Sequence, residues 1–256
     1  MQERDNDPGL AIPDADYLAQ ALQAQKESRL DEGLALSQLA WEQAVAGGKI
    51  EDQIEAGRLK AFFLYRSGAL AQLLEAGDEV LPLLRAQGPS ERLCELLRWV
   101  TLGGFETGNF ELATRCASES HAVAQALGDV RQIALSLNAL GAGFERMGDP
   151  WQAERVMNEA VALVRDSDHV FENLASLNNL CGVALGAFYL LRDSGNDAES
   201  AAALGRALDY ARGAQPLARA FGDPFPLVMT EGNLAEALLH SGHLDEAESL
   251  LRQTLQ

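Results

Sequence analysis

The chain has 256 residues, of which 47% are hydrophobic, and this is enough apolar material for a sizeable core without disulfides or metals. Its 38 acidic and 20 basic residues give a net charge of −18, which argues against nucleic acid or an anionic membrane surface as a partner. Helix formers such as Ala, Leu, Glu and Gln dominate and no period-2 pattern develops, so we expect an all-α protein with almost no strand.

The first residues, 1–13, carry Pro8, Gly9 and Pro13 and show little periodicity, so we expect a flexible lead-in before the first helix. They lack a basic region followed by an apolar stretch, and no later run approaches the ~20 apolar residues that a membrane span requires. These features predict a cytoplasmic protein.

Turn signals recur along the chain at one fixed interval. They form two series, Ser28, Gly68, Gly108, Gly148 and Gly48, Gly88, Gly128, Asp168. Self-similarity at a period of about 40 residues marks a solenoid, in which each unit buries its apolar face by stacking on its neighbours. The sequence therefore predicts an α-solenoid of about six antiparallel helical hairpins.

We expect one solenoid domain over residues 14–256, in which the first helix of each hairpin is called A and the second B. The repeats are expected near 14–48, 49–88, 89–128, 129–168, 169–222 and 223–256, the last one incomplete. At the turn of the fourth repeat, Gly148 ends helix A, Asp149 can cap helix B and Pro150 occupies its first turn. Gly77 and Pro82 are expected to interrupt the B helix of the second repeat.

The fifth repeat departs from the period. Its turn lies at Gly195 rather than at position 188, and the next inter-repeat signal lies at Gly222 rather than at position 208. Both helices thus gain seven residues, close to two helical turns, so we expect this hairpin to project by ~10 Å and Pro216 to kink its B arm. The apolar arms either pack on one another or support self-association of two chains, through Leu185, Phe188, Tyr189 and Leu191.

Small residues recur at fixed distances from the turns. Ala21, Ala61, Thr101, Gly141 and Ala235 lie seven residues before a turn, and Gly33, Ala113, Ala153 and Ala247 lie five residues after one. In this spacing the chain resembles the tetratricopeptide repeat family, best over 137–161 and 233–251 and less well over nearly all the rest. The resemblance implies a right-handed superhelix that binds proteins or peptides. The long period is similar to the variant in bacterial regulatory proteins, including cytoplasmic receptors for signalling peptides.

The resemblance also implies that the A helices line the concave face. Positions three before the small residue, and one and four after it, share one helical face and point into that groove. The candidate ligand groove is therefore formed by Arg58, Phe62, Tyr65, Arg98, Leu102, Phe105, Asn138, Ala142, Glu145, Asn178, Gly182 and Leu185.

The polar members of this groove suggest how a peptide would be held. Asn138 and Asn178 offer both donors and an acceptor to a peptide backbone, and the two arginines could hold a carboxylate. The alternatives are that the arginines pair within their own helices with Glu55 and Glu95, and that the asparagines bond neighbouring helices.

The sequence gives little support for a catalytic site. Cys94, Cys116 and Cys181 show no CxxC spacing and are expected to be buried reduced thiols. Of the four histidines only His240 and His243 are close together, and solvated surface histidines are favoured over metal ligands. No phosphate-binding loop or nucleophilic constellation is present in the sequence, so we expect neither an enzyme nor a cofactor or metal site in this segment.

We expect a protein- or peptide-binding domain that is the sensory, regulatory or scaffolding part of a larger bacterial cytoplasmic protein. The final helix, from about Leu244, is short and lacks a polar capping helix, so we expect the natural protein to continue beyond Gln256. One alternative is a dimerisation module of a signalling enzyme, such as a cyclic-dinucleotide synthase or a kinase, whose catalytic domain follows Gln256. Another is a constitutive scaffold that binds a fixed partner.

Overall fold

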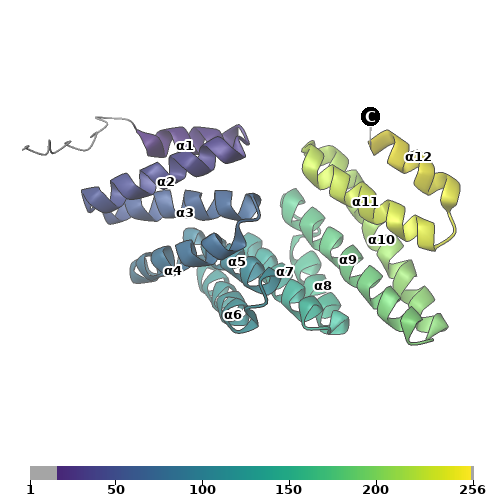
Figure 1. The fold of residues 1–256 in the computed structure, drawn as a ribbon. Coiled ribbons are helices and arrows are strands. Elements are labelled where there is room, and N and C mark those ends of the chain that lie inside the picture. Colours follow the sequence, from purple (N-terminus) through teal and green to yellow (C-terminus); the bar gives the residue numbers. More distant parts are fainter. Residues whose placement is uncertain (1–15, 255–256) are drawn as a thin grey trace, which may run out of the picture. The chain divides into compact units, whose positions relative to one another are not determined.

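The computed structural model describes residues 16–254, which form twelve α-helices and contain no strand (Figure 1). The all-α prediction is confirmed for this range. The expected lead-in, residues 1–13, lies outside the described residues.

The helices follow one another as hairpins of an A and a B helix, joined by short turns. They are α1 (Tyr17–Lys26), α2 (Leu30–Gly47), α3 (Ile50–Arg66), α4 (Leu70–Gln87), α5 (Glu91–Glu106), α6 (Phe110–Leu127), α7 (Val130–Arg146), α8 (Pro150–Val164), α9 (Val170–Asp193), α10 (Asp197–Phe221), α11 (Pro224–His240) and α12 (Leu244–Thr254).

The chain divides into two compact units, one up to Leu83 and one from Leu84 onward. The first unit holds α1, α2, α3 and most of α4, and the second unit holds the other helices. The expectation of one continuous domain stays a prediction.

The turns lie where the sequence period places them, because glycine accepts the left-handed backbone that ends a helix tightly. Positive φ angles between 66° and 90° occur at Gly48, Gly68, Gly88, Gly108, Gly128, Gly148, Gly195, Gly222 and Gly242. At the fourth turn the Asp149 carboxylate accepts from the Gln152 amide at 3.0 Å, and Pro150 is the first residue of α8. The predicted local chemistry of this turn is confirmed.

Within a hairpin, small residues bring the two helices into close contact. A Cβ at Gly141 of α7 would lie 2.6 Å from the Met157 side chain of α8, and a Cβ at Gly104 of α5 would lie 3.0 Å from the Ala113 Cβ of α6. Such separations are shorter than van der Waals contact, so larger residues at these positions would force the helices apart.

The B helix of the second repeat is continuous, so the predicted interruption at Gly77 and Pro82 is wrong. Helix α4 runs through both residues. A proline removes one hydrogen bond to the carbonyl four residues earlier, at Asp78, and both Pro82 and Asp78 are exposed. Solvent can satisfy that carbonyl, and α10 likewise continues through the exposed Pro216.

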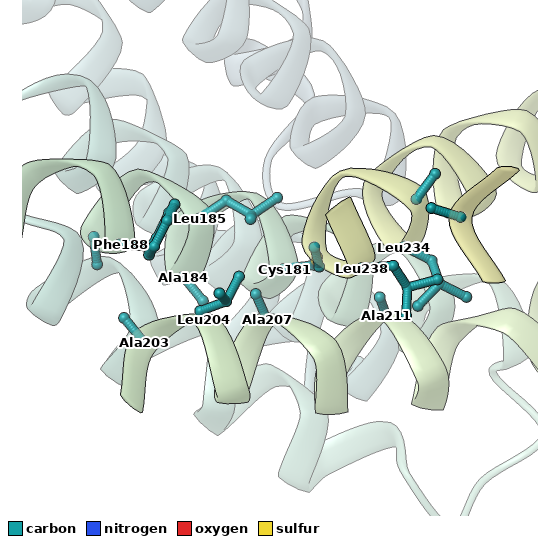
Figure 2. Packing of buried hydrophobic residues seen from close by; sticks show 14 of the residues in the cluster. Cys181, Ala184, Leu185, Phe188, Ala203, Leu204, Ala207, Ala211, Leu234 and Leu238 are labelled. Atoms are coloured by element: carbon teal, nitrogen blue, oxygen red, sulfur yellow. The ribbon is translucent and has the colours of Figure 1, made fainter. Parts of the chain in front are cut away.

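The fifth hairpin has the lengthened arms that the sequence predicts, 24 residues in α9 and 25 in α10. Its apolar side chains form a cluster with α11 and α12, in which Leu185 and Phe188 lie near Leu204, and Leu238 lies near Leu234 and Ala211 (Figure 2). Leu185, Phe188 and Leu191 are only 4%, 7% and 9% exposed. The Phe188 ring lies 5.1 Å from the His240 ring of α11, so part of this surface is used within the chain. The expected self-association through these three residues and the half-buried Tyr189 stays a prediction.

Helix α9 is the one described helix that is long and apolar enough to cross a membrane, with a mean hydropathy of 1.5 over 18 residues. The expectation that no such run exists is wrong for this helix. More than half of that window, 56%, is buried inside the protein, and a buried core helix passes the same test. The packing of α9 between α10 and α11 accounts for its apolar composition.

The three cysteines are free and buried, as the sequence predicts. Burial raises the pKa of Cys94 to about 11 and that of Cys181 to about 12, because a thiolate is poorly solvated among apolar neighbours.

Ser28 is the one non-glycine residue in the described range with a positive φ, 55°. Because this conformation is strained for an L-residue with a side chain, we expect Ser28→Gly to stabilise the first unit by about 1 kcal/mol. The control is Ser67→Gly, one residue before the next turn, where φ is −86° and no strain exists to relieve. The thermal unfolding midpoint should rise for the first variant only, and an equal rise for both would contradict the assignment.

Candidate ligand-binding face

In the second unit the A helices pack directly on one another. Helix α7 lies against α5 and α9, and α9 lies against α11, whereas the B helices α6, α8 and α10 pack on A helices (Figure 1). The A helices are therefore spaced more closely than the B helices, which are held apart by the A helices between them. In a curved array the more closely spaced row lies on the inner side, so the A helices form the inner side of this unit.

Long side chains bridge the outer side between α8 and α10. The Glu154 carboxylate accepts from Arg206 at 2.7 Å and from the Tyr210 hydroxyl at 2.9 Å, and Asn158 donates to that hydroxyl at 3.1 Å. Burial raises the pKa of Tyr210. These partners lie 52 to 56 residues apart, so the repeat period gave no signal for them.

Three of the predicted groove residues, Arg58, Phe62 and Tyr65, lie on α3 of the first unit. Arg58 donates to both oxygens of Glu55, at 2.7 Å and 3.2 Å, so it pairs within its own helix. The Phe62 ring stands edge-on to Phe63 at 5.2 Å, and Tyr65 is half-buried. The alternative of intrahelical pairing is thus the observed arrangement for Arg58.

Three more of the predicted residues are buried between helices of the second unit, so their assignment to an open groove is wrong. The Phe105 ring occupies the space beside Gly143, where a Cβ would lie 2.3 Å away. Asn138 is 5% exposed and its amide donates to the Ser176 hydroxyl of α9 at 2.8 Å. Leu185 belongs to the cluster of the fifth hairpin.

The other residues of this column remain at the surface of the inner side. Arg98, Leu102, Ala142, Asn178 and Gly182 are half-buried and Glu145 is exposed. Arg98 and Leu102 lie on α5, Ala142 and Glu145 on α7, and the other two on α9.

Helix α9 presents a bare strip of backbone between α7 and α11. Asn178, Gly182 and Gly186 are four residues apart and share one helical face. A Cβ at Gly182 would meet nothing within 4 Å, and one at Gly186 would meet only the Glu145 carboxylate at 3.9 Å. Among the described residues the Asn178 side-chain oxygen has no hydrogen-bond partner. We call this region, formed by Asn178, Gly182 and Gly186 with Ala142 and Glu145, the glycine strip.

A polar cluster that sequence reasoning missed lies next to the glycine strip. The Tyr189 hydroxyl donates to Glu236 at 2.6 Å and lies 2.7 Å from His240 Nε2, both on α11. The rings of Tyr189 and His240 meet edge to face at 5.2 Å, and the Arg192 guanidinium lies 5.1 Å from the Tyr189 ring centre. His240 is therefore part of a helix contact rather than a freely solvated residue. The only sequence signal was the four-residue spacing of Glu236 and His240.

The glycine strip has an acidic border. Although Glu145 as a whole residue is exposed, desolvation of its carboxyl group raises the pKa of that group. Arg146 opposes this shift and Glu106 adds to it. Arg146 pairs with Glu106, and Glu236 accepts from Tyr189. The described residues contain no group of three His, Cys, Asp or Glu placed to hold a metal ion. This surface therefore suits a ligand that carries positive charge and hydrogen-bond donors.

Burial and the Glu236 carboxylate raise the pKa of Tyr189 from 10 to about 12, because both disfavour the phenolate. Such a group contributes stability that is complete below pH ~10 and is lost as the pH rises towards 12. We expect Tyr189→Phe to flatten the decline in unfolding free energy over this interval, measured by urea unfolding at several pH values. Tyr17→Phe is the control, and identical pH profiles of wild type and Tyr189→Phe would contradict the prediction.

Residues 99–166, from helix α5 to just beyond the end of α8, match a family model described as "Tetratricopeptide repeat". No curated protein matches the chain.

Several solved structures resemble the chain at low sequence identity. A Rap protein complexed with Competence and Sporulation Factor is 14% identical, with a TM-score of 0.59 over 93% of this chain and 73% of the Rap chain. A signal transduction ATPase with a tetratricopeptide repeat sensor, from Pyrococcus horikoshii, is 14% identical, with a TM-score of 0.62 over 93% of this chain and 35% of the ATPase. A thermophilic TPR protein of Thermus thermophilus is 18% identical, with a TM-score of 0.58 over 87% and 97% of the two chains.

Proposed function

Because this chain has the tetratricopeptide-repeat fold, and matches that family in sequence over residues 99–166, we propose that it binds a peptide or a segment of a partner protein on the inner face of its second unit. The resemblance inferred from the repeated small residues is confirmed. The proposal includes a regulatory role in a bacterial cytoplasmic protein, as the long repeat period suggests.

The glycine strip is the observation that carries this proposal. A helix normally covers its backbone with side chains, but α9 leaves Gly182 and Gly186 bare over two turns. Glycine costs about 1 kcal/mol relative to alanine in a helix interior, so two of them on one exposed face lower stability in a way that packing within this chain does not explain. A ligand backbone that approaches α9 closely would explain it.

Polar groups beside the glycine strip can fix the orientation of a bound ligand. The unpartnered Asn178 oxygen can accept a hydrogen bond once a small side-chain rotation exposes it, and the Asn178 amide can donate one. Glu145 and Glu236 stand on opposite sides of α9, on α7 and α11. We therefore propose that the ligand carries lysine or arginine side chains, which these carboxylates attract.

The comparisons support the same class of function. The Rap structure holds the Competence and Sporulation Factor, and in the Pyrococcus ATPase the repeat region is named a sensor. The chain spans about a third of that ATPase, 35%, so attachment of this domain to an output activity is also part of the proposal.

Blocking the strip is the direct test of the function. We expect Gly182→Leu and Gly186→Leu to abolish ligand binding while raising the thermal midpoint, because leucine has the higher helix propensity and its Cβ would meet nothing nearer than the Glu145 carboxylate, 3.9 Å from Gly186. The matched control is Gly205→Leu on α10, where a Cβ also meets nothing within 4 Å. The probe is a phage-displayed library of random twelve-residue peptides, selected on the wild-type chain.

Peptides from that selection should be rich in lysine and arginine and should bind less tightly at higher salt, because the border of the strip is acidic. They should bind the Gly205→Leu variant as well as the wild type. Equal binding to all the variants, with the fold intact, would place the ligand elsewhere and overturn the proposal.

A further inference from the structure

One position of the A helices points into the groove between two B helices. In α9 it is Leu180, which packs with Met157 of α8 and with the partly buried Tyr210 of α10. In α5, α7, α9 and α11 this position holds Val100, Leu140, Leu180 and Leu234. Val100, Leu180 and Leu234 are at most 3% exposed, so the later repeats place an apolar side chain here.

Helix α3 has a lysine at this position, whereas the shorter α1 has the exposed Gln20. Lys60 lies one period before Val100, and its side chain is only 17% exposed. Its Nζ atom lies 3.6 Å from the Glu79 carboxylate, which is beyond hydrogen-bond distance, and 5.8 Å from the centre of the Trp41 ring. Taking an ammonium group out of water costs free energy. A charge at a position that is apolar in all the later A helices therefore points to a function rather than to packing.

Lys60 lines a hollow of about 410 Å³ in the first unit. The residues of the hollow that matter for its chemistry are Leu34 from α2, Lys60 and Leu64 from α3, and Glu75 and Glu79 from α4. All of them lie in the described part of the chain. The volume is within the range of small-molecule binding sites. We call the region formed by these five residues the lysine hollow.

The corresponding groove of the second unit is closed by side chains of the chain itself. Its floor is the apolar Leu180, and Tyr210 packs in the same cluster while its hydroxyl donates to Glu154. The same carboxylate accepts from Arg206, so these side chains join α8 to α10. In the lysine hollow, Lys60 replaces the apolar floor and a space remains between the helices.

The lysine hollow combines groups of both charges with apolar side chains. The Lys60 ammonium has three donors, which Glu79 at 3.6 Å does not satisfy. Glu75 and Glu79 are four residues apart and so stand one helical turn from each other on α4. Two carboxylates outnumber one ammonium, so the hollow as a whole repels a simple anion, while Lys60 repels a simple cation. A ligand that carries both charges satisfies both kinds of group.

We propose that the lysine hollow binds a free α-amino acid with an aliphatic side chain, for which leucine is the probe. The carboxylate of the amino acid accepts hydrogen bonds from Lys60, and its ammonium group donates to Glu75 and Glu79. Its side chain lies against Leu34 and Leu64, which supply the apolar part of the hollow. This inference concerns the first unit and is independent of the proposed ligand face.

The first test is isothermal titration calorimetry of the full chain with free leucine and two analogues. Isocaproate has the carboxylate and side chain of leucine without the ammonium group, and isoamylamine has the ammonium group and side chain without the carboxylate. We expect leucine to bind and each analogue to bind about tenfold more weakly or worse, because each loses one charge-assisted contact.

Variants of the two charged sides locate the site. Lys60→Leu should abolish leucine binding and raise the thermal midpoint, because it restores the apolar residue of the later repeats. The matched control is Lys49→Leu, which removes the same charge from a side chain that is 79% exposed and should bind leucine like the wild type. Glu75 is exposed, so Glu75→Gln should fold normally, weaken leucine binding and not weaken isocaproate binding.

Absence of leucine binding to the wild type would overturn the proposal, as would equal leucine binding to Lys60→Leu and Lys49→Leu. Isocaproate binding as tight as that of leucine would overturn the role of the two carboxylates. Peptide binding at the glycine strip of the second unit is measured separately in the same variants and should not change, so failure here is distinct from failure of the proposed function.

Discussion

Close approach of two helices within each hairpin is the constraint on which the rest of this structure depends. Gly141 and Gly104 lie where a single added carbon would meet a side chain of the facing helix, at 2.6 Å and 3.0 Å. Because the helices touch there, the turn between them must be tight, and a left-handed residue makes it so. The fixed spacing between the small residues and the turns therefore follows from one geometric requirement repeated along the chain.

The fifth hairpin shows how the array accommodates a longer unit. Seven more residues in each arm preserve the facing of α9 and α10, because seven residues are close to two helical turns. The additional apolar surface joins one cluster with α11 and α12, in which the Phe188 ring lies 5.1 Å from that of His240. Self-association is not needed to bury this surface, and the sixth hairpin gains an anchoring surface instead.

On the inner face of the second unit, the close packing of the helices determines which side chains remain at the surface for a ligand. Direct contact between α5, α7 and α9 places the Phe105 ring against Gly143 and pairs the Asn138 amide with Ser176, so neither side chain is available to a ligand. What remains at the surface is a strip of α9 backbone with acidic groups on both sides.

The sequence by itself determined the helices, their turns and the lengthened fifth hairpin, because glycine at positive φ and the helical period are local properties. It also indicated the pairing of Arg58 with Glu55, three residues away in the same helix, as an alternative to ligand binding. Only the tertiary structure decided which residues of an A helix face a neighbour and which face a ligand. A helix packed on both sides, such as α9, buries Leu185 as well as Leu180, and its periodicity does not separate the two faces. The contacts of Asn138 with Ser176 and of Tyr189 with His240 join residues 38 and 51 positions apart, and such distances are set by how the hairpins stack.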